Sequence, residues 1–254
     1  MNKALNVVIC GYPKSGTTWL TRLLSECMLC PSAGYWDVDS KSISTEGLER
    51  ASKFVCYKSH DLCSHLKNNE KVWKVISIVR NPKDIVVSGA YHFNFIGNKI
   101  KKGKFGRGLL SSFDKYFVPI FYKKHLMHNA IINGNKNIKG LEIAWDAHIK
   151  DTLNSNVIMV KYEELLNMPV EKIVKILKYL NYPIDIDKIE RSIANQSFDK
   201  KKDEFKIAGN KLKAKHLRKG ISEEWRMELN DSIASNIENT FNDTLVQLNY
   251  SVNL

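Results

Sequence analysis

A stretch near the beginning of the chain has the residue types and the spacing of an anion-binding loop. Residues 11–18 read Gly-Tyr-Pro-Lys-Ser-Gly-Thr-Thr and stand between an apolar segment and a segment of helical periodicity. Backbone N–H groups at such a strand–turn–helix converge on an anion, and the helix dipole favours negative charge there. Lys14 adds a cation to this loop, and Ser15, Thr17 and Thr18 add hydroxyl groups. The loop therefore predicts binding of a phosphate-like group.

The spacing of this loop is close to the nucleoside-triphosphate motif G-x-x-x-x-G-K-[ST], but Thr17 stands where that motif requires Lys. Without that Lys, an important contact to the β- and γ-phosphates would be lost. No predicted strand ends in a clear metal-binding Asp either. A P-loop kinase or nucleoside triphosphatase is therefore the second interpretation, and failure to bind MgATP would remove it.

Short apolar segments that predict buried strands alternate with segments of helical periodicity. The predicted strands are residues 5–10, 54–58, 72–79 and 156–161. The predicted helices are residues 17–29, one from 82, 140–153, 169–180 and most of 222–248. Loops are predicted at residues 32–52, 99–108 and 200–220. This alternation predicts an α/β protein with P-loop-like α/β/α layers, a central, mostly parallel sheet and a single domain over residues 1–254.

Ligands of such sheets bind beyond the carboxyl ends of the strands. This rule selects the polar stretches that follow each predicted strand, which are Gly11–Thr18, Lys58–His60, Arg80–Ser88 and Tyr162. We expect these stretches to form one site.

Six stretches resemble, in family order, the motifs of sulfotransferases that use 3′-phosphoadenosine 5′-phosphosulfate (PAPS). They cover most of the chain and are Tyr12–Leu20, Lys58-Ser59-His60, Arg80–Ser88, Val160–Glu164, Gln196-Ser197-Phe198 and Arg218-Lys219-Gly220. The resemblance implies sulfuryl transfer from PAPS to a hydroxyl or amine of a small-molecule acceptor, leaving adenosine 3′,5′-bisphosphate (PAP).

The resemblance also implies four catalytic roles. His60 would be the general base, and an unperturbed histidine pKa of about 6.5 suits that task. Lys14 would stabilise the leaving phosphate. Lys58 would help to neutralise the transferring group, with a solvated surface lysine as its second interpretation. Ser88 would restrain Lys14 until the acceptor binds.

The implied nucleotide site draws on all of these motifs. Its residues would be Pro13, Lys14, Ser15, Gly16, Thr17, Thr18, Trp19, Arg80, Ser88, Tyr162, Ser197, Phe198, Arg218, Lys219 and Gly220. No metal is expected, because the basic residues of this set can meet the charge of the donor. Trp19 has a second interpretation as core packing on its helix.

Several features depart from the family pattern. Gln196 replaces the family Thr, and the Gly-Asp that usually precedes Trp225 is absent. The family dimer motif is not recognisable, so the oligomeric state stays open. The chain starts almost at its first predicted strand. We therefore expect its acceptor pocket to be lined by other segments than in the animal cytosolic members of the family. The residues that could line this pocket are Tyr35, Trp36, Tyr91, Phe93, Phe95 and the basic loop 99–104. The aromatic residues could equally belong to the core, and the basic loop could equally be a solvated surface.

Composition narrows the remaining choices. The chain of 254 residues has 39 Lys+Arg and 27 Asp+Glu, a net charge of +12, which indicates an anionic partner. A basic nucleic-acid-binding module is the non-enzyme alternative, but no recognition-helix or RNP-like pattern is present, so no nucleic acid is expected.

No apolar run is long enough to insert into a membrane. For that reason sulfation of polysaccharide or protein ranks below a small molecule. Five cysteines, an odd number, favour a reducing compartment and a cytoplasmic location.

Overall fold

The computed structural model describes residues 4–38, 43–95, 118–210 and 217–251, and the chain divides into two units. The first unit consists of residues up to Gly11, Ser15–Val79 and Asp151–Ile221. The second consists of Tyr12–Lys14, Arg80–Lys150 and residues from Ser222 onward. The single domain over 1–254 therefore stays a prediction, and each unit is described by itself.

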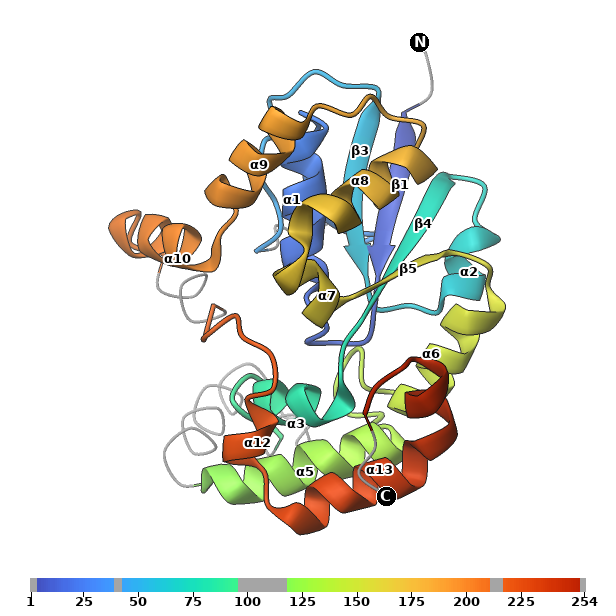
Figure 1. The fold of residues 1–254 in the computed structure, drawn as a ribbon, viewed down its shortest axis with the longest axis vertical. Helices are drawn as coiled ribbons and strands as arrows, with labels where there is room; N and C mark the ends of the chain where they lie inside the picture. Colours follow the sequence, from blue (N-terminus) through green and yellow to red (C-terminus); the bar gives the residue numbers. More distant parts are fainter. Residues whose placement is uncertain (1–3, 39–42, 96–117, 211–216, 252–254) are drawn as a thin grey trace, which may run out of the picture. The chain divides into compact units, whose positions relative to one another are not determined.

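Strands are interspersed with helices up to Lys161, and the described elements that follow are all helices (Figure 1). In chain order they are β1 (Leu5–Cys10), α1 (Thr17–Cys27), β2 (Ser32–Tyr35), β3 (Phe54–Ser59), α2 (Cys63–Lys67), β4 (Val72–Val79), α3 (Pro82–Ala90), α5 (Ile120–Asn133), α6 (Trp145–Asn154), β5 (Ile158–Lys161), α7 (Tyr162–Asn167), α8 (Pro169–Tyr179), α9 (Ile186–Asn195), α10 (Phe198–Ile207), α12 (Trp225–Glu228) and α13 (Asp231–Gln247).

The first unit is built on a five-stranded sheet with the order β2-β3-β1-β4-β5. Every pairing between these strands is parallel, and β1 lies at the centre with Val7 opposite Cys56 of β3 and Lys74 of β4. Parallel strands end at the same edge, so the segments after β1, β3 and β4 begin at one edge of the sheet. This arrangement confirms the predicted parallel sheet.

Side chains of β1 alternate between two apolar clusters, one on each face of the sheet. Val7 and Ile9 pack in a cluster with residues of α1, α8 and α9. Val8 and Cys10 pack with Cys63 and Leu66 of α2. Burial on both faces explains why β1 is apolar from Val7 to Cys10. The sheet with a helical layer on each face is the predicted α/β/α arrangement.

The second unit is helical and contains α3, α5, α12 and α13 (Figure 1). Helix α3 is buried over almost its whole length. A Cβ on its Gly89 would lie 2.5 Å from the sulfur of Met127 in α5, so the two helices approach closely at this glycine. Trp145 and Phe241 pack with their ring centroids 5.1 Å apart.

The structure corrects three of the predicted elements. The predicted loop 200–220 is helical up to Ile207, because α10 is rich in Lys and acidic residues and has the i,i+3 pairs Lys201–Glu204 and Asp203–Lys206. The predicted irregular segment 32–52 contains the edge strand β2, which pairs with β3. The predicted helix 140–153 begins only at Trp145. Helices α2, α5, α7 and α9 were not among the predicted elements.

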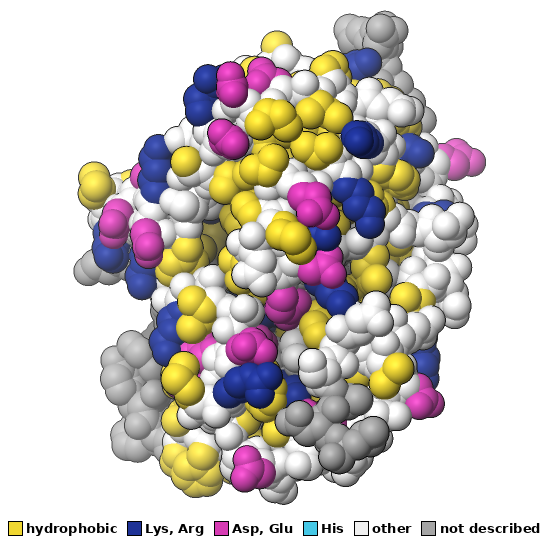
Figure 2. Space-filling view, in the orientation of Figure 1, with side chains coloured by type: hydrophobic (Ala, Val, Ile, Leu, Met, Phe, Trp, Pro, Cys, Tyr) yellow, Lys and Arg dark blue, Asp and Glu magenta, His cyan; other side chains and the backbone are white. Residues whose placement is uncertain are grey.

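Charged side chains of both signs share the molecular surface. On the face drawn in Figure 2, Lys and Arg side chains are interspersed with Asp and Glu. Among the described residues, no helix is long and apolar enough to cross a membrane.

Candidate functional site

The turn between β1 and α1 is packed so tightly that it requires glycine at two positions. Gly16 has φ +96°, and a Cβ there would lie 2.6 Å from Cδ2 of Tyr162. A Cβ on Gly11 would lie 2.4 Å from the carbonyl oxygen of Ile78 in β4. The turn is thus fixed against β4 and Tyr162, as a preorganised anion site requires.

The beginning of α1 is polar and buried. None of the described side chains caps the helix N-terminus, where Gly16 is the N-cap. The hydroxyl of Ser15 is buried and has no hydrogen-bond partner among the described residues. An orphaned hydroxyl beside an uncapped helix N-terminus fits a bound anion, which both groups would hydrogen-bond.

Lys58 lies at the end of β3 with its side chain directed to the same helix. Its Nζ donates a hydrogen bond to Oγ1 of Thr18 at 3.1 Å and lies 4.1 Å from the centre of the Tyr35 ring. Lys58 is only 3% exposed. Burial lowers the pKa of Lys58 to about 8, because removal from water disfavours the charged form. At neutral pH the ammonium group still carries its charge.

His60 follows β3 and is oriented by the backbone of the loop. Its Nδ1 lies 2.8 Å from the carbonyl oxygen of Gly11. Because a carbonyl oxygen only accepts, Nδ1 carries the hydrogen, and Nε2 is the basic nitrogen of the neutral ring. The Tyr35 ring meets the imidazole edge-on, with centroids 5.8 Å apart. Tyr35 thereby contacts both His60 and Lys58, and Lys58 in turn contacts Thr18.

Trp19 lies on α1, and contacts hold one edge of its indole ring in place. Its indole N–H donates to the backbone oxygen of Gln196 at 3.1 Å, and its ring meets that of Tyr162 edge-on at 5.8 Å. Trp19 is half-buried at the margin of the core. Both interpretations of this residue therefore stay open, because packing fixes one edge of the indole and the rest of its surface is partly exposed.

The C-terminal motif of the first unit contacts α10. Gly220 has φ +69°, and a Cβ there would lie 2.5 Å from Cδ2 of Phe198. Nζ of Lys202 lies 5.5 Å from the centre of the Phe198 ring and donates to the backbone oxygen of Arg218 at 3.3 Å. Phe198 is thus brought together with Arg218 and Gly220, which lie about twenty residues further along the chain.

In the second unit, Arg80 is tied to the loop lysine. The Arg80 side chain is buried, and its Nη1 donates to the backbone oxygen of Lys14 at 3.1 Å. Lys14 has a positive φ of 74°, which is unfavourable for a residue with a side chain. Arg80 therefore supports the strained conformation of Lys14.

The structure gives the positions of four further predicted site residues, but no contact described above bears on their roles. Pro13 is buried in the loop, and Ser88 is half-buried on α3. Ser197 is the N-cap of α10, and Lys219 is exposed.

Asp84, in the first turn of α3, is a residue that the sequence analysis missed. Its carboxylate accepts from the backbone N–H of Glu223 at 2.8 Å and of Trp225 at 3.1 Å. Burial raises its pKa, and the nearby Arg80 opposes that shift. Asp84 anchors the segment that follows Arg218-Lys219-Gly220 in the sequence. Its only sequence signal is an acidic residue in a first helical turn, which normally indicates a helix start.

The candidate walls of the acceptor pocket have different surroundings. Tyr35 contacts His60 and Lys58, as described above. Trp36 packs edge-on against Tyr57, and Phe95 is buried. Tyr91 is exposed, Phe93 is half-buried, and the basic loop 99–104 lies outside the described residues. No group of three His, Cys, Asp or Glu residues suited to a metal ion occurs in the described part of the chain.

The sulfotransferase domain family matches residues 5–249, nearly the whole chain. The chain belongs to this family, and the predicted membership and enzyme class are confirmed. Human sulfotransferase 2A1 is 26% identical over 268 residues, covering 96% of this chain and 85% of the relative. The 3-beta-hydroxysteroid sulfotransferase of Cavia porcellus is 27% identical over 241 residues, covering 85% of this chain and 75% of the relative.

Solved structures share the fold. Mouse sulfotransferase SULT7A1, complexed with PAP, has a TM-score of 0.67 and 19% identity, covering 95% of this chain and 84% of that one. Retinol dehydratase in complex with androsterone and the inactive cofactor PAP has a TM-score of 0.59 and 15% identity, covering 98% of this chain and 82% of that one. At such identities the likeness establishes the fold, and the predicted α/β/α class is confirmed.

Proposed function

We propose that this sulfotransferase transfers the sulfuryl group of PAPS to a hydroxyl or amine of a small-molecule acceptor. The observation that carries the proposal is the uncapped N-terminus of α1 beside the orphaned, buried hydroxyl of Ser15. This is an anion site at the carboxyl end of a central parallel strand. The two PAP complexes among its structural neighbours support the choice of donor.

PAPS supplies a sulfuryl group on a phosphate oxygen, and the chain supplies the groups that hold its 5′ side. Ser15, Thr17, Thr18 and the first N–H groups of α1 bind the 5′-phosphate. Lys14 stabilises the charge that develops on this phosphate. Ser88 restrains Lys14 until the acceptor binds.

Other motif residues bind the 3′-phosphate and the adenosine. Arg80, Ser88, Arg218 and Lys219 meet the 3′-phosphate, for which a guanidinium fork is suited. The adenosine contacts Trp19, Tyr162, Ser197 and Phe198, in part by stacking. Gly220 belongs to the stretch that clamps the 3′-phosphate. Pro13 shapes the loop.

His60 accepts the proton of the acceptor hydroxyl or amine at Nε2. Its Nδ1–H donates to the Gly11 carbonyl, a contact that orients the ring and stabilises the imidazolium that forms. Such a base contributes about 10²–10⁴-fold to the rate. The ammonium of Lys58, held at Thr18, helps to neutralise the transferring group.

We also propose a cytoplasmic location, supported by five free cysteines, and no role for nucleic acid as a ligand. Filter binding at physiological salt should therefore retain no nucleic acid.

Thermal unfolding with PAP tests the proposed donor, with AMP and MgATP as controls. At 100 times Kd, PAP should stabilise the protein by about 2.7 kcal/mol, which raises Tm by about 5–11 °C for a chain of this size. The Lys14→Ala variant should lose most of this shift. A shift with MgATP and none with PAP would instead favour the P-loop kinase or triphosphatase.

A further inference from the structure

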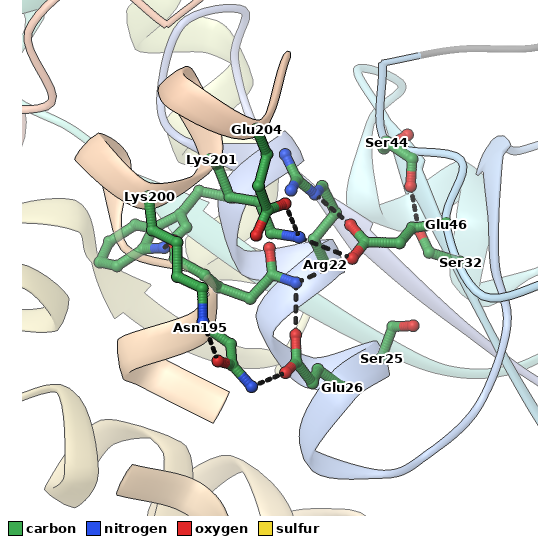
Figure 3. Close-up of polar contacts among 12 residues, drawn as sticks. Arg22, Ser25, Glu26, Ser32, Ser44, Glu46, Asn195, Lys200, Lys201 and Glu204 are labelled. Atoms are coloured by element: carbon green, nitrogen blue, oxygen red, sulfur yellow. Dashed lines mark hydrogen bonds and ion pairs between the residues drawn. The ribbon is translucent and has the colours of Figure 1, made fainter. Parts of the chain in front are cut away.

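Glu46, which lies between β2 and β3, is the centre of a polar network that no sequence motif predicted (Figure 3). Its carboxylate accepts from Nε of Arg22 at 2.7 Å, from Nζ of Lys201 at 2.9 Å and from Nε2 of Gln196 at 3.1 Å. Arg22 belongs to α1, Lys201 belongs to α10, and Gln196 directly precedes α10. Glu46 therefore connects α1 to the beginning of α10.

The backbone holds Glu46 in place. Its N–H donates to the carbonyl oxygen of Ser32 at 3.0 Å, and the N–H of Ser32 donates back at 2.9 Å. The Arg22 and Gln196 side chains are almost fully buried. Burial alone would raise the pKa of Glu46, but Arg22 and Lys201 outweigh it and hold the pKa at about 2. Glu46 is thus ionised throughout the neutral range, and a charge-assisted network of this kind is stronger than an isolated surface ion pair.

A second carboxylate strengthens the same junction. Glu26 of α1 accepts from Nε2 of Gln196 and, at 2.7 Å, from Nδ2 of Asn195. Figure 3 shows both carboxylates directed toward the junction between α9 and α10. The amide of Gln196, which replaces the family Thr, thus bridges Glu26 and Glu46, while its backbone oxygen holds the indole of Trp19. The departure from the family pattern at this position coincides with the bridge.

The junction carries groups of the proposed nucleotide site. Phe198 begins α10, and Lys202, one residue after Lys201, donates to the backbone oxygen of Arg218. Gly220 packs against Phe198. A shift of α10 relative to α1 would therefore move Phe198 and Arg218 away from Trp19 and the phosphate loop.

We propose that Glu46 is a positioning residue for the donor nucleotide. It holds α10 on α1, so that Phe198 and the Arg218–Gly220 stretch are already arranged for the adenosine and its 3′-phosphate before binding. This inference rests on the proposed function.

The test compares PAP affinities by titration calorimetry. Glu46→Ala should raise the Kd of PAP about tenfold, because part of the binding free energy would then be used to order α10. Lys201→Met removes the α10 side of the network and leaves the Arg22–Glu46 pair intact, so it should act in the same direction. In the double variant the two effects should not add, since both changes break one connection.

Asp203→Asn is the matched control, because Asp203 forms an exposed ion pair with Lys206 within α10. Its Kd should stay within about twofold of wild type. Inorganic pyrophosphate, which can occupy the phosphate loop but has no adenosine, should bind all variants equally. A merely structural role of Glu46 would weaken both ligands together.

The outcomes separate the two proposals. If wild-type protein does not bind PAP, the proposed function fails. If wild type binds PAP and Lys201→Met binds it equally well, the role of the network is refuted, whether or not Glu46→Ala folds. Equal losses of PAP and pyrophosphate affinity would also refute positioning.

Discussion

At the scale of single residues, burial determines what the charged groups of the candidate site can do. The sequence placed Lys58 and His60 after a strand, and family motifs suggested their roles. Neither the pKa of Lys58 nor the hydrogen-bonded nitrogen of His60 could be predicted, because both depend on groups distant in the sequence. The Tyr35 ring and the Gly11 carbonyl are such groups.

Lys58 gives a prediction about pH. Its ammonium, held at Thr18 beside the proposed 5′-phosphate site, loses its proton as the pH rises through about 8, so the positive charge that would attract PAP is present below that pH and lost above it. The Kd of PAP should rise by up to about tenfold between pH 7 and pH 9. Calorimetric titrations at several pH values measure this change.

Lys58→Met should bind PAP more weakly at pH 7 and show no such step. A step of unchanged size in this variant would assign the titration to another group.

At the scale of elements, strands were predicted more accurately than the segments that connect them. Strands β1 and β4 begin and end where the apolar pattern predicts, because burial on both faces leaves a clear signal. Helix α10 was predicted as a loop, since its sequence FDKKKDEFKI has little apolar periodicity. It is stabilised by local i,i+3 charge pairs along the helix. It is also stabilised by the network at Glu46, a residue distant in sequence, which the pattern of α10 does not reveal.

The first turn of α3 gives a prediction about stability. In Asp84→Ala, the N–H groups of Glu223 and of the buried Trp225 would lose their acceptor, at a cost of about 1–3 kcal/mol in the free energy of unfolding. Asp84→Asn should cost less, because its amide oxygen still accepts one bond and the buried charge is gone. Urea denaturation measures both, with the exposed Asp187→Asn as control.

Equal stability of wild type and Asp84→Ala would show that the two N–H groups find other acceptors. In that case Asp84 would not anchor the segment after Gly220.

At the scale of the whole molecule, the sequence predicted the class of fold and family. It did not predict the division into two units, because hydrophobic periodicity identifies elements and not the contacts among them. The exposure of the five cysteine thiols is a property that can be predicted only from the complete fold. All five are buried in the first unit, and each is at most 2% exposed.

Thiol reactivity should therefore depend on unfolding of this unit. An aromatic disulfide reagent should label none of the five thiols rapidly in native protein and all five in denaturant. Mass spectrometry after brief labelling counts the modified residues. Rapid labelling of Cys10 or Cys63 in native protein would indicate that the sheet face under α2 opens readily.

The hydrogen bond between His60 and the Gly11 carbonyl has a consequence for how specificity can diverge. It ties His60, the proposed base, to Gly11, the first residue of the anion-binding loop, so the two keep their spacing when the segments around the acceptor change. Substitutions in those segments can then change which acceptor binds without moving the group that is proposed to accept its proton. Acceptor choice and the position of the proposed base would then depend on different parts of the chain.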